Sequence, residues 1–237
     1  MGFVNPRLEE RLDDYSSAGN PSVHVRRIEN VQDHAAARNS LVLWHFDAVV
    51  YTHICFLDAD MEPPAQFLER MLAVEKPAVS GVSHVWRSKS PGRSPEPLLA
   101  LWKRRTQPDG SDTYDRCELA GDGHAMFEDP GLATGCFGML VEGWVFERLR
   151  ERFGLPWFKT EYVAETQEKA LSEDIFLCRN LERLDIPVTI LPDLVFGHRK
   201  TVSLADVAEY GRTMEEKGRL DALDGMRHVE EFAREAL

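Results

Sequence analysis

The order of apolar and polar residues predicts helices and strands in alternation along the chain. Apolar residues at helical spacing predict helices, whereas strict alternation and short apolar runs predict strands. The expected helices are residues 6–17, 34–46, one that begins at Pro63-Pro64, 142–153, one that follows Ser172, and a charged tail from Ser203. The expected strands are residues 22–28, 51–57, 78–86, 98–102 and 186–191.

Strands that alternate with helices favour an α/β fold built on one sheet. The Pro-, Ser- and Gly-rich stretch at residues 87–97 predicts a loop, and the polar residues 106–131 predict mostly irregular structure. No internal repeat and no clear domain boundary are visible. We therefore expect one domain over residues 1–202 and a helical C-terminal tail over residues 203–237.

Composition and charge narrow the classes of function. The chain has 237 residues, 43% of them apolar, and a formal net charge of -12. That charge argues against a nucleic-acid or anionic-membrane surface, since both need clustered Lys and Arg. A negatively charged ligand would need a metal ion or local positive groups. The apolar runs are too short to span a bilayer, and residues 1–7 contain no signal-peptide core.

The four cysteines are Cys55, Cys117, Cys136 and Cys178, and none belongs to a C-x-x-C pair. This pattern favours free thiols in a reducing compartment, so we expect a cytoplasmic protein.

An acidic pair follows the expected strand 51–57. Asp58 and Asp60 are one residue apart, at the kind of strand end that faces the ligand crevice of open α/β sheets. In an extended segment both side chains would lie on one side and would hold one hard divalent cation through oxygen. The pair is equally compatible with a turn that carries two solvated carboxylates.

Two further motifs lie downstream. Ser172, Glu173 and Asp174 open an expected helix, where the acids either cap backbone N–H groups or act as a general base in the crevice. His198, which follows Gly197, is either a third metal ligand or a residue that ends a strand.

Taken together, five segments resemble those of GT-A glycosyltransferases, in particular the bacterial and phage enzymes similar to family 2. The resemblance covers roughly residues 22–200, and the segments occur in the family's order. They are Ala-Ala-Arg-Asn (36–39), Phe-Leu-Asp-Ala-Asp-Met-Glu-Pro-Pro (56–64), Ala-Thr-Gly-Cys-Phe-Gly-Met-Leu-Val (133–141), Ser-Glu-Asp-Ile-Phe-Leu-Cys (172–178) and Gly-His (197–198). The resemblance implies a GT-A-like (Rossmann-like) mixed sheet flanked by helices.

The resemblance also implies a nucleotide-diphospho-sugar donor, with a UDP-sugar favoured, and a Mn²⁺ or Mg²⁺ ion that neutralises the leaving diphosphate. Asp60 matches the direct metal ligand, His198 the later histidine of the metal site, and Asp58 a residue that helps with either the metal or the donor ribose. The acceptor would be a glycan or another molecule with a free hydroxyl group.

The remaining matches concern catalysis and the donor sugar. Asp174 matches the base of inverting members, and Glu173 is placed to orient the acceptor. Thr134 and Gly135 match a loop beside the donor sugar, and Arg38 either contacts the nucleotide or caps its helix. The motifs do not distinguish an inverting from a retaining mechanism. Three tryptophans fit either sugar stacking or core packing, namely Trp86, Trp102 and Trp157.

One departure from the family pattern concerns the N-terminal region. Family members begin with a strand, a helix and a second strand, and residues 1–30 supply at most a helix and one strand. The first strand is therefore expected to be missing, which favours an alternative, a non-catalytic GT-A-derived binding module without a donor pocket. A nucleotidyltransferase is a third reading, but the Gly-rich basic phosphate loop typical of that class is not found.

Overall fold

The computed structural model describes residues 6–18, 21–28, 31–48, 51–87, 94–117, 128–163, 166, 169–199 and 204–216. The chain divides into two compact units, and each is considered by itself. The first unit comprises residues 1–84 and 99–199, and the second comprises residues 85–98 and 200–237. All the candidate site residues belong to the first unit.

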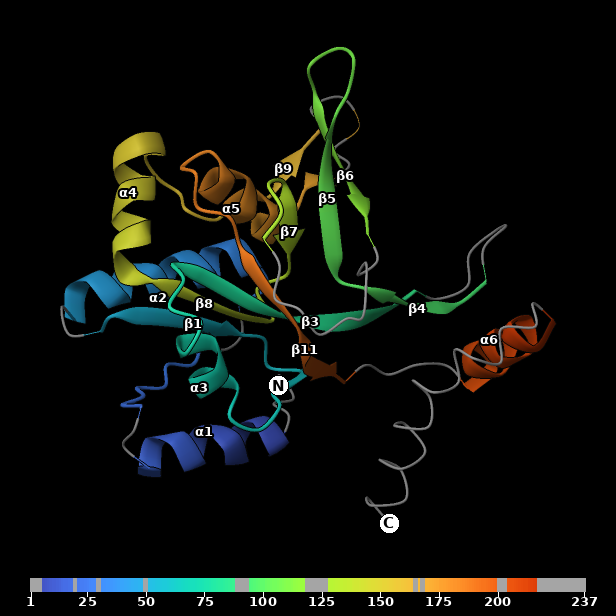
Figure 1. Ribbon diagram of the computed structural model, residues 1–237, viewed down its shortest axis with the longest axis horizontal. Coiled ribbons are helices and arrows are strands. Elements are labelled where there is room, and N and C mark those ends of the chain that lie inside the picture. The colour runs from blue at the N-terminus through green and yellow to red at the C-terminus, as the bar shows by residue number, and fades with distance from the viewer. Residues whose placement is uncertain are drawn as a thin grey trace. The chain divides into compact units, whose positions relative to one another are not determined.

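The first unit is built on a mixed sheet with the strand order β1-β8-β3-β11-β2 (Figure 1). These strands are β1 (His53–Leu57), β8 (Gly138–Glu142), β3 (Ala78–Arg87), β11 (Thr189–His198) and β2 (Met61–Glu62). Only β3 and β11 pair in parallel, whereas the β1–β8, β8–β3 and β11–β2 pairs are antiparallel. The expected α/β class with a mixed sheet is confirmed.

Helices cover both faces of this sheet (Figure 1). On one face lie α2 (His34–Ala48), α4 (Gly143–Phe153) and α5 (Glu173–Glu182), and on the other lie α1 (Pro6–Ala18) and α3 (Phe67–Leu72). The sheet is therefore flanked by helices, as expected.

The core on the α2, α4 and α5 side is apolar and densely aromatic. The ring of Phe56 on β1 packs edge-to-face against Phe146 on α4 and against Phe158. On the other side, Phe67 of α3 packs against Phe196 of β11. A Cβ at Gly138 would lie only 2.4 Å from the Phe196 ring, so glycine is needed for β8 to approach that ring.

Two smaller sheets complete the first unit. Strands β5 (Leu101–Thr106), β6 (Asp112–Arg116) and β7 (Leu132–Thr134) form one, with β5 between the others. Strands β9 (Glu161–Tyr162) and β10 (Lys169–Leu171) pair separately. The β5–β6 hairpin corrects the expectation of irregular structure over residues 106–131, of which 118–127 lie outside the described residues.

Three other expectations about local structure were wrong. In residues 22–28 Val23 and Val25 are half-buried in alternation, as in a strand, but among the described residues they pair with no strand. The helix after Pro63-Pro64 begins only at Phe67, because Gln66 has a left-handed backbone with φ of 55°. The expected strand 98–102 is divided between β4 (Glu96–Leu99) and β5.

The last strand runs further than its sequence suggests. The strand expected at residues 186–191 was predicted to end before Pro192, whereas β11 continues to His198. Its register on β3 shifts between Ile190 and Val195, which is where proline, lacking an N–H, is tolerated in a strand. This continuation brings His198 to the edge that carries β2.

The second unit contains α6 (Leu204–Glu216) and most of β4, which pairs with β3. In this unit the Trp86 and Tyr210 rings meet edge-to-face at 5.7 Å. Residues 88–93 and 217–237, which include much of the expected loop and tail, lie outside the described residues.

Candidate functional site

A buried arginine joins three carboxylates at the end of β1. Arg38 Nη2 donates a hydrogen bond of 2.9 Å to Asp58 Oδ1. Arg38 Nη1 donates to Glu173 Oε1 at 2.6 Å and to Asp174 Oδ1 at 3.3 Å. The Arg38 side chain is only 7% exposed. A planar guanidinium suits this arrangement, because its fixed fork of N–H donors contacts Asp58 through one nitrogen and both Glu173 and Asp174 through the other.

Three separate elements bring these groups together. Arg38 projects from α2, Asp58 follows the last residue of β1, and the acidic pair Glu173 and Asp174 forms the first turn of α5. Helix α2 is fixed nearby by Asn39, whose side chain exchanges two hydrogen bonds with the backbone of Phe158. The Ser172 side chain makes no capping hydrogen bond, so the expected hydroxyl cap of α5 is absent.

The second acid of the pair has a different partner. Asp60 Oδ2 lies 3.0 Å from His198 Nε2, and His198 Nδ1 lies 3.1 Å from the carbonyl oxygen of His84. Pairing of β2 with β11 places Met61 opposite His198, and the Arg199 N–H donates to the Asp60 carbonyl oxygen at 2.9 Å. The short β2 strand thus holds Asp60 beside this histidine.

The acidic pair does not sit in an extended segment. Ala59 and Asp60 form a turn, closed by a 3.1 Å hydrogen bond from the Met61 N–H to the Asp58 carbonyl oxygen. In consequence Asp58 contacts Arg38 while Asp60 contacts His198. Within the described part of the chain, no group of three or more His, Cys, Asp and Glu side chains is arranged to hold a metal ion.

The two acids of α5 differ in protonation. Burial raises the pKa of Asp174 to about 6, an effect that the Arg38 charge opposes and the Glu173 carboxylate reinforces. Burial also acts to raise the pKa of Glu173, but a hydrogen bond from Asp174 and the charges of Arg38 and Lys169 outweigh it and lower the pKa. Of the two, Asp174 is therefore the one that exchanges a proton near neutral pH.

The segment after β7 forms one wall of the arginine cluster. Thr134 is buried, and its hydroxyl donates to the Ala100 carbonyl oxygen at 3.1 Å, so this side chain is used within the protein. A Cβ at Gly135 would lie 3.3 Å from Asp174 Oδ2 and 2.7 Å from the Phe137 ring. Burial raises the pKa of the Cys136 thiol well above its usual value, which keeps it neutral beside these charges.

Sequence reasoning missed two residues beside Glu173. His34 Nδ1 lies 3.6 Å from Glu173 Oε1, and Lys169 Nζ lies 3.7 Å from Glu173 Oε2. A signal existed for His34, which precedes Arg38 by four residues on α2, the spacing that brings helical side chains together. Lys169 lies on β10 and Glu173 on α5, so helical spacing does not predict their contact.

The candidate stacking tryptophans have different surroundings. Trp157 belongs to the core, where its Nε1 donates to the Phe146 carbonyl oxygen at 2.8 Å. The Arg116 guanidinium lies over the Trp102 ring, 5.0 Å from the ring centroid. Core packing is therefore the correct reading for Trp157.

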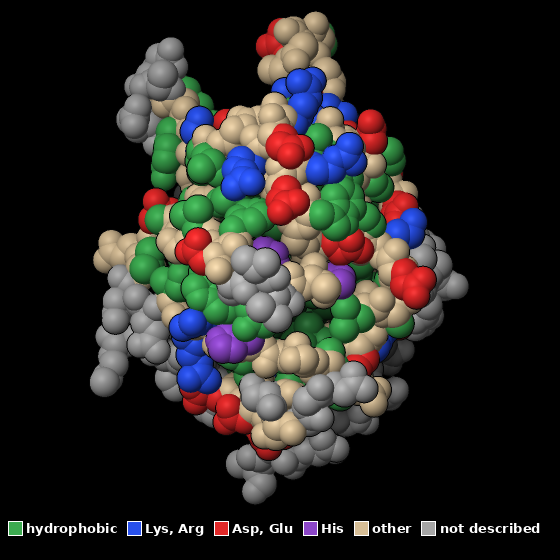
Figure 2. Space-filling model, turned by 90° about the vertical axis from the view of Figure 1, so that its left-hand side faces the viewer, with side chains coloured by type: hydrophobic (Ala, Val, Ile, Leu, Met, Phe, Trp, Pro, Cys, Tyr) green, Lys and Arg blue, Asp and Glu red, His purple; other side chains and the backbone are tan. Residues whose placement is uncertain are grey.

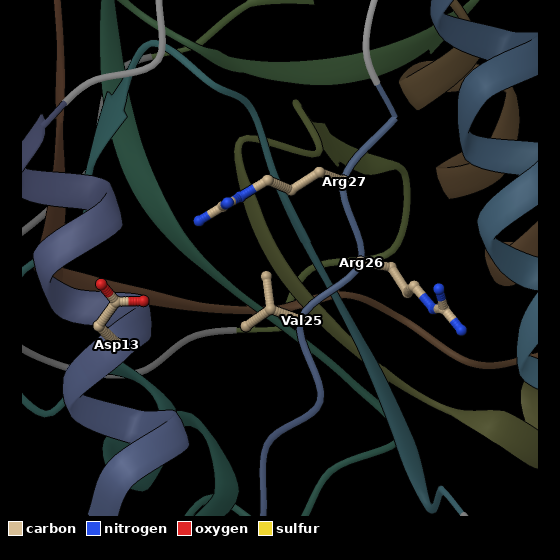
Figure 3. Close-up of a pocket in the computed structure, with 4 residues that line it drawn as sticks. All are labelled: Asp13, Val25, Arg26 and Arg27. Carbon is tan, nitrogen blue, oxygen red and sulfur yellow. The ribbon is translucent and has the colours of Figure 1, made fainter.

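A pocket of about 380 Å³ lies at a different place, between α1 and the extended segment 22–28. It is lined by Asp13, Val25, Arg26 and Arg27, and the two arginine side chains leave the backbone in opposite directions (Figure 3). Arg26 lies over the Trp44 ring at 4.4 Å. This pocket contains none of the carboxylates around Arg38.

Acidic and basic side chains are interspersed on the face shown in Figure 2, with apolar groups between them. Among the described side chains in that view, Lys and Arg form no continuous patch. Among the described residues, no helix is both long enough and apolar enough to cross a bilayer.

Comparison with known proteins gives no family assignment. No family model and no curated protein matches the sequence. Among solved structures, A197 from STIV is similar with a TM-score of 0.49 and 15% identity, over 84% of this chain and 83% of that chain. GalNAc-T7, solved with UDP, GalNAc and Mn²⁺, is similar with a TM-score of 0.46 and 13% identity, over 84% of this chain and 36% of that chain.

Both TM-scores are too low to decide the fold or the activity of this chain. The fold class is given by the chain's own mixed sheet, and membership of family 2 is not shown. The likeness to GT-A enzymes stays a resemblance of ordered motifs.

Proposed function

We propose that this chain is a metal-dependent glycosyltransferase that moves a sugar from a nucleotide-diphosphate donor to an acceptor hydroxyl, with inversion at the anomeric carbon. One observation carries the proposal. Motifs far apart in the sequence meet at the end of β1, where Arg38 joins Asp58 to Glu173 and Asp174, and the neighbouring Asp60 meets His198.

Asp60 and His198 fit one side of a divalent-cation site. Their oxygen and nitrogen atoms are 3.0 Å apart, a separation suited to two adjacent ligands of one ion. Mg²⁺ and Mn²⁺ sites for phosphorylated substrates use few protein ligands and take the remaining oxygens from phosphates and water. The bound ion would supply charge neutralisation for the departing diphosphate. Asp58 lies two residues away, close enough to serve the ion or the donor ribose.

Asp174 is proposed as the general base. Its pKa, raised by burial to about 6, suits a group that accepts a proton near neutral pH. Glu173 stays ionised between Arg38 and Lys169, so it orients the acceptor rather than taking its proton. A Cβ at Gly135 would lie 2.7 Å from the Phe137 ring and 3.3 Å from Asp174 Oδ2, so glycine allows the segment proposed to lie beside the donor sugar to pack against the base.

A binding module without catalysis is the second candidate. It is favoured by the contact between Asp58 and Arg38 and by the lack of a three-ligand metal group in the described residues. Such a module would retain the buried ion network for stability alone.

Thermal stability with UDP or GDP, each with and without Mn²⁺, tests the proposal. A ligand that binds only the folded state raises the melting temperature, by an amount equivalent to about 2.7 kcal/mol at 100 times Kd. We expect a shift that requires both UDP and Mn²⁺ and that Asp60→Asn abolishes. Asp193→Asn is the matched control, because Asp193 is an exposed acid paired with Arg70.

A catalytic arm separates the two candidates. Asp174→Asn is expected to retain the shift with UDP and Mn²⁺ but to abolish release of UDP from a UDP-sugar. Retained turnover would place the base elsewhere. A wild-type chain that shows no shift with any pair of nucleotide and metal would favour the binding module.

A further inference from the structure

Arg38 donates hydrogen bonds to both halves of the site. Its Nη2 serves Asp58 and its Nη1 serves Glu173 and Asp174, so one guanidinium is divided between the β1 end and the α5 end. The Arg38 side chain is 7% exposed, whereas that of Asp58 is 41% exposed. Asp58 is thus the partner that a ligand can reach.

We propose that Arg38 is a positioning residue shared by both ends, and that a ligand which engages Asp58 withdraws this carboxylate and leaves the guanidinium to Glu173 and Asp174. This inference rests on the proposed function for the identity of the ligand, a cation or a donor hydroxyl. The division of Arg38 itself needs no ligand.

The geometry favours a shift toward Asp174. The bond from Arg38 to Glu173 is already short at 2.6 Å, whereas the contact with Asp174 is long at 3.3 Å and has room to tighten. A closer guanidinium stabilises the ionised carboxylate of Asp174, which is the form that accepts a proton. Engagement of Asp58 would in this way prepare the base before the acceptor arrives.

Other groups near Asp174 do not reproduce this link. Glu173 is adjacent in sequence and is itself held by Lys169 and His34, at 3.7 Å and 3.6 Å. The thiols of Cys136 and Cys178 also face Asp174, and burial raises the pKa of each, so both are neutral. Among these described neighbours, Arg38 is the group that also contacts Asp58.

A titration of Asp174 by carboxyl ¹³C NMR tests the link without metal, nucleotide or turnover. Asp58→Asn removes the competing anion and is expected to lower the pKa of Asp174 by about 1 unit. Asp60→Asn is the matched control, since it removes a charge two residues away that is paired with His198. It is expected to give a clearly smaller shift.

Arg38→Lys provides the second arm. A lysine ammonium is a point charge without the guanidinium fork, so it does not hold both ends at once. In this background Asp58→Asn should no longer move the pKa of Asp174. Equal shifts from Asp58→Asn and Asp60→Asn in the wild-type background would overturn the inference, because they would indicate only through-space repulsion.

The titration of Asp174 and the binding test with UDP and Mn²⁺ can succeed or fail independently of each other. A large and specific Asp58→Asn shift, in a chain that binds no UDP with Mn²⁺, would establish the shared arginine and reject the transferase. A chain that binds UDP with Mn²⁺, but in which Asp58→Asn leaves the pKa of Asp174 unchanged in the metal-free titration, would reject the shared arginine alone.

Discussion

The carboxylates at the two ends of the candidate site differ in their partners and in their exposure to solvent. At the α5 end, Glu173 and Asp174 surround a buried guanidinium, and their side chains are 6% and 18% exposed. At the β2 end, Asp60 is 35% exposed and faces an imidazole. One end therefore has a permanent cation built in, whereas the other keeps a carboxylate within reach of solvent.

This difference indicates which end depends more on its internal contacts for stability and which end is more exposed to a ligand. A buried charge is costly to leave unpaired, so a fixed ion network commits its members to each other. An exposed pair gains little from its contact and loses little when a ligand replaces one partner. Mutations at the two ends should consequently differ most in stability.

The largest expected effect is that of Arg38→Met. It leaves buried carboxylates without their cation, and removing one partner of a buried pair costs roughly 3–5 kcal/mol. Urea denaturation measures the change. Arg70→Met is the matched control, because the Arg70–Asp193 pair is exposed and should cost only about 0–1 kcal/mol. Equal losses in the two variants would remove the distinction between the ends.

Gly135→Ala should have the next largest effect. Its Cβ would lie 2.7 Å from the Phe137 ring and 3.3 Å from Asp174 Oδ2, and overpacking of this kind costs roughly 1–3 kcal/mol. Gly197→Ala at the other end would meet Glu62, with its Cβ at 3.1 Å and its carbonyl oxygen at 3.6 Å, and should be tolerated better. Denaturation of both variants under the same conditions makes the comparison, and a larger loss in Gly197→Ala would contradict it.

A smaller difference is expected between the two acids of the Asp-x-Asp pair. Asp58→Asn weakens a charged hydrogen bond to buried Arg38 and should cost about 1–2 kcal/mol. Asp60→Asn changes a more exposed contact and should cost about 0–1 kcal/mol. Equal stability of the two variants would show that position along the turn, rather than the partner, determines the effect.

Much of the fold could be predicted from the sequence because local patterns determined it. The apolar runs gave β1 and β3, and the helices α2 and α4 follow from their own residues. The predictions that failed were those that depend on which strands pair with each other. Residues 22–28 alternate like a strand but have no pairing strand in the described part of the chain. Strand β11 continues past Pro192 because a register shift on β3 accommodates the irregularity.

The sequence predicted which residues belong to the candidate site but not which of them contact each other. Asp58, Asp60, Asp174 and His198 were each chosen from motifs, yet the turn at residues 59–60 that separates the two acids depends on the pairing of β2 with β11. Arg38 was assigned to the nucleotide or a helix cap. Its contacts span 135 and 136 positions of sequence to α5, and no local pattern encodes contacts over such a separation.

The smallest expected effect is a pH dependence whose two parts have opposite signs in the wild type and are separated in two variants. In Glu173→Gln, burial still acts to raise the pKa of the remaining Asp174 above its usual 3.8, although the contribution of the Glu173 carboxylate is lost, so the folded state holds more protons just above pH 3.8. Its contribution to stability is then fully present below pH 3.8 and is lost as the pH rises through the raised pKa.

In Asp174→Asn the sign is opposite. The remaining Glu173 has a pKa below its usual 4.5, since the Asn amide still donates a hydrogen bond and Arg38 and Lys169 still attract it against the effect of burial. Its contribution is present above pH 4.5 and is lost as the pH falls through the lowered pKa. Urea denaturation between about pH 3 and pH 7 should therefore show the stability of Asp174→Asn increasing with pH relative to that of Glu173→Gln. The titration of all other groups is the same in both variants, so it cancels when one stability curve is subtracted from the other. Parallel curves of stability against pH would mean that the two acids share one environment, contrary to what their contacts at the α5 end indicate.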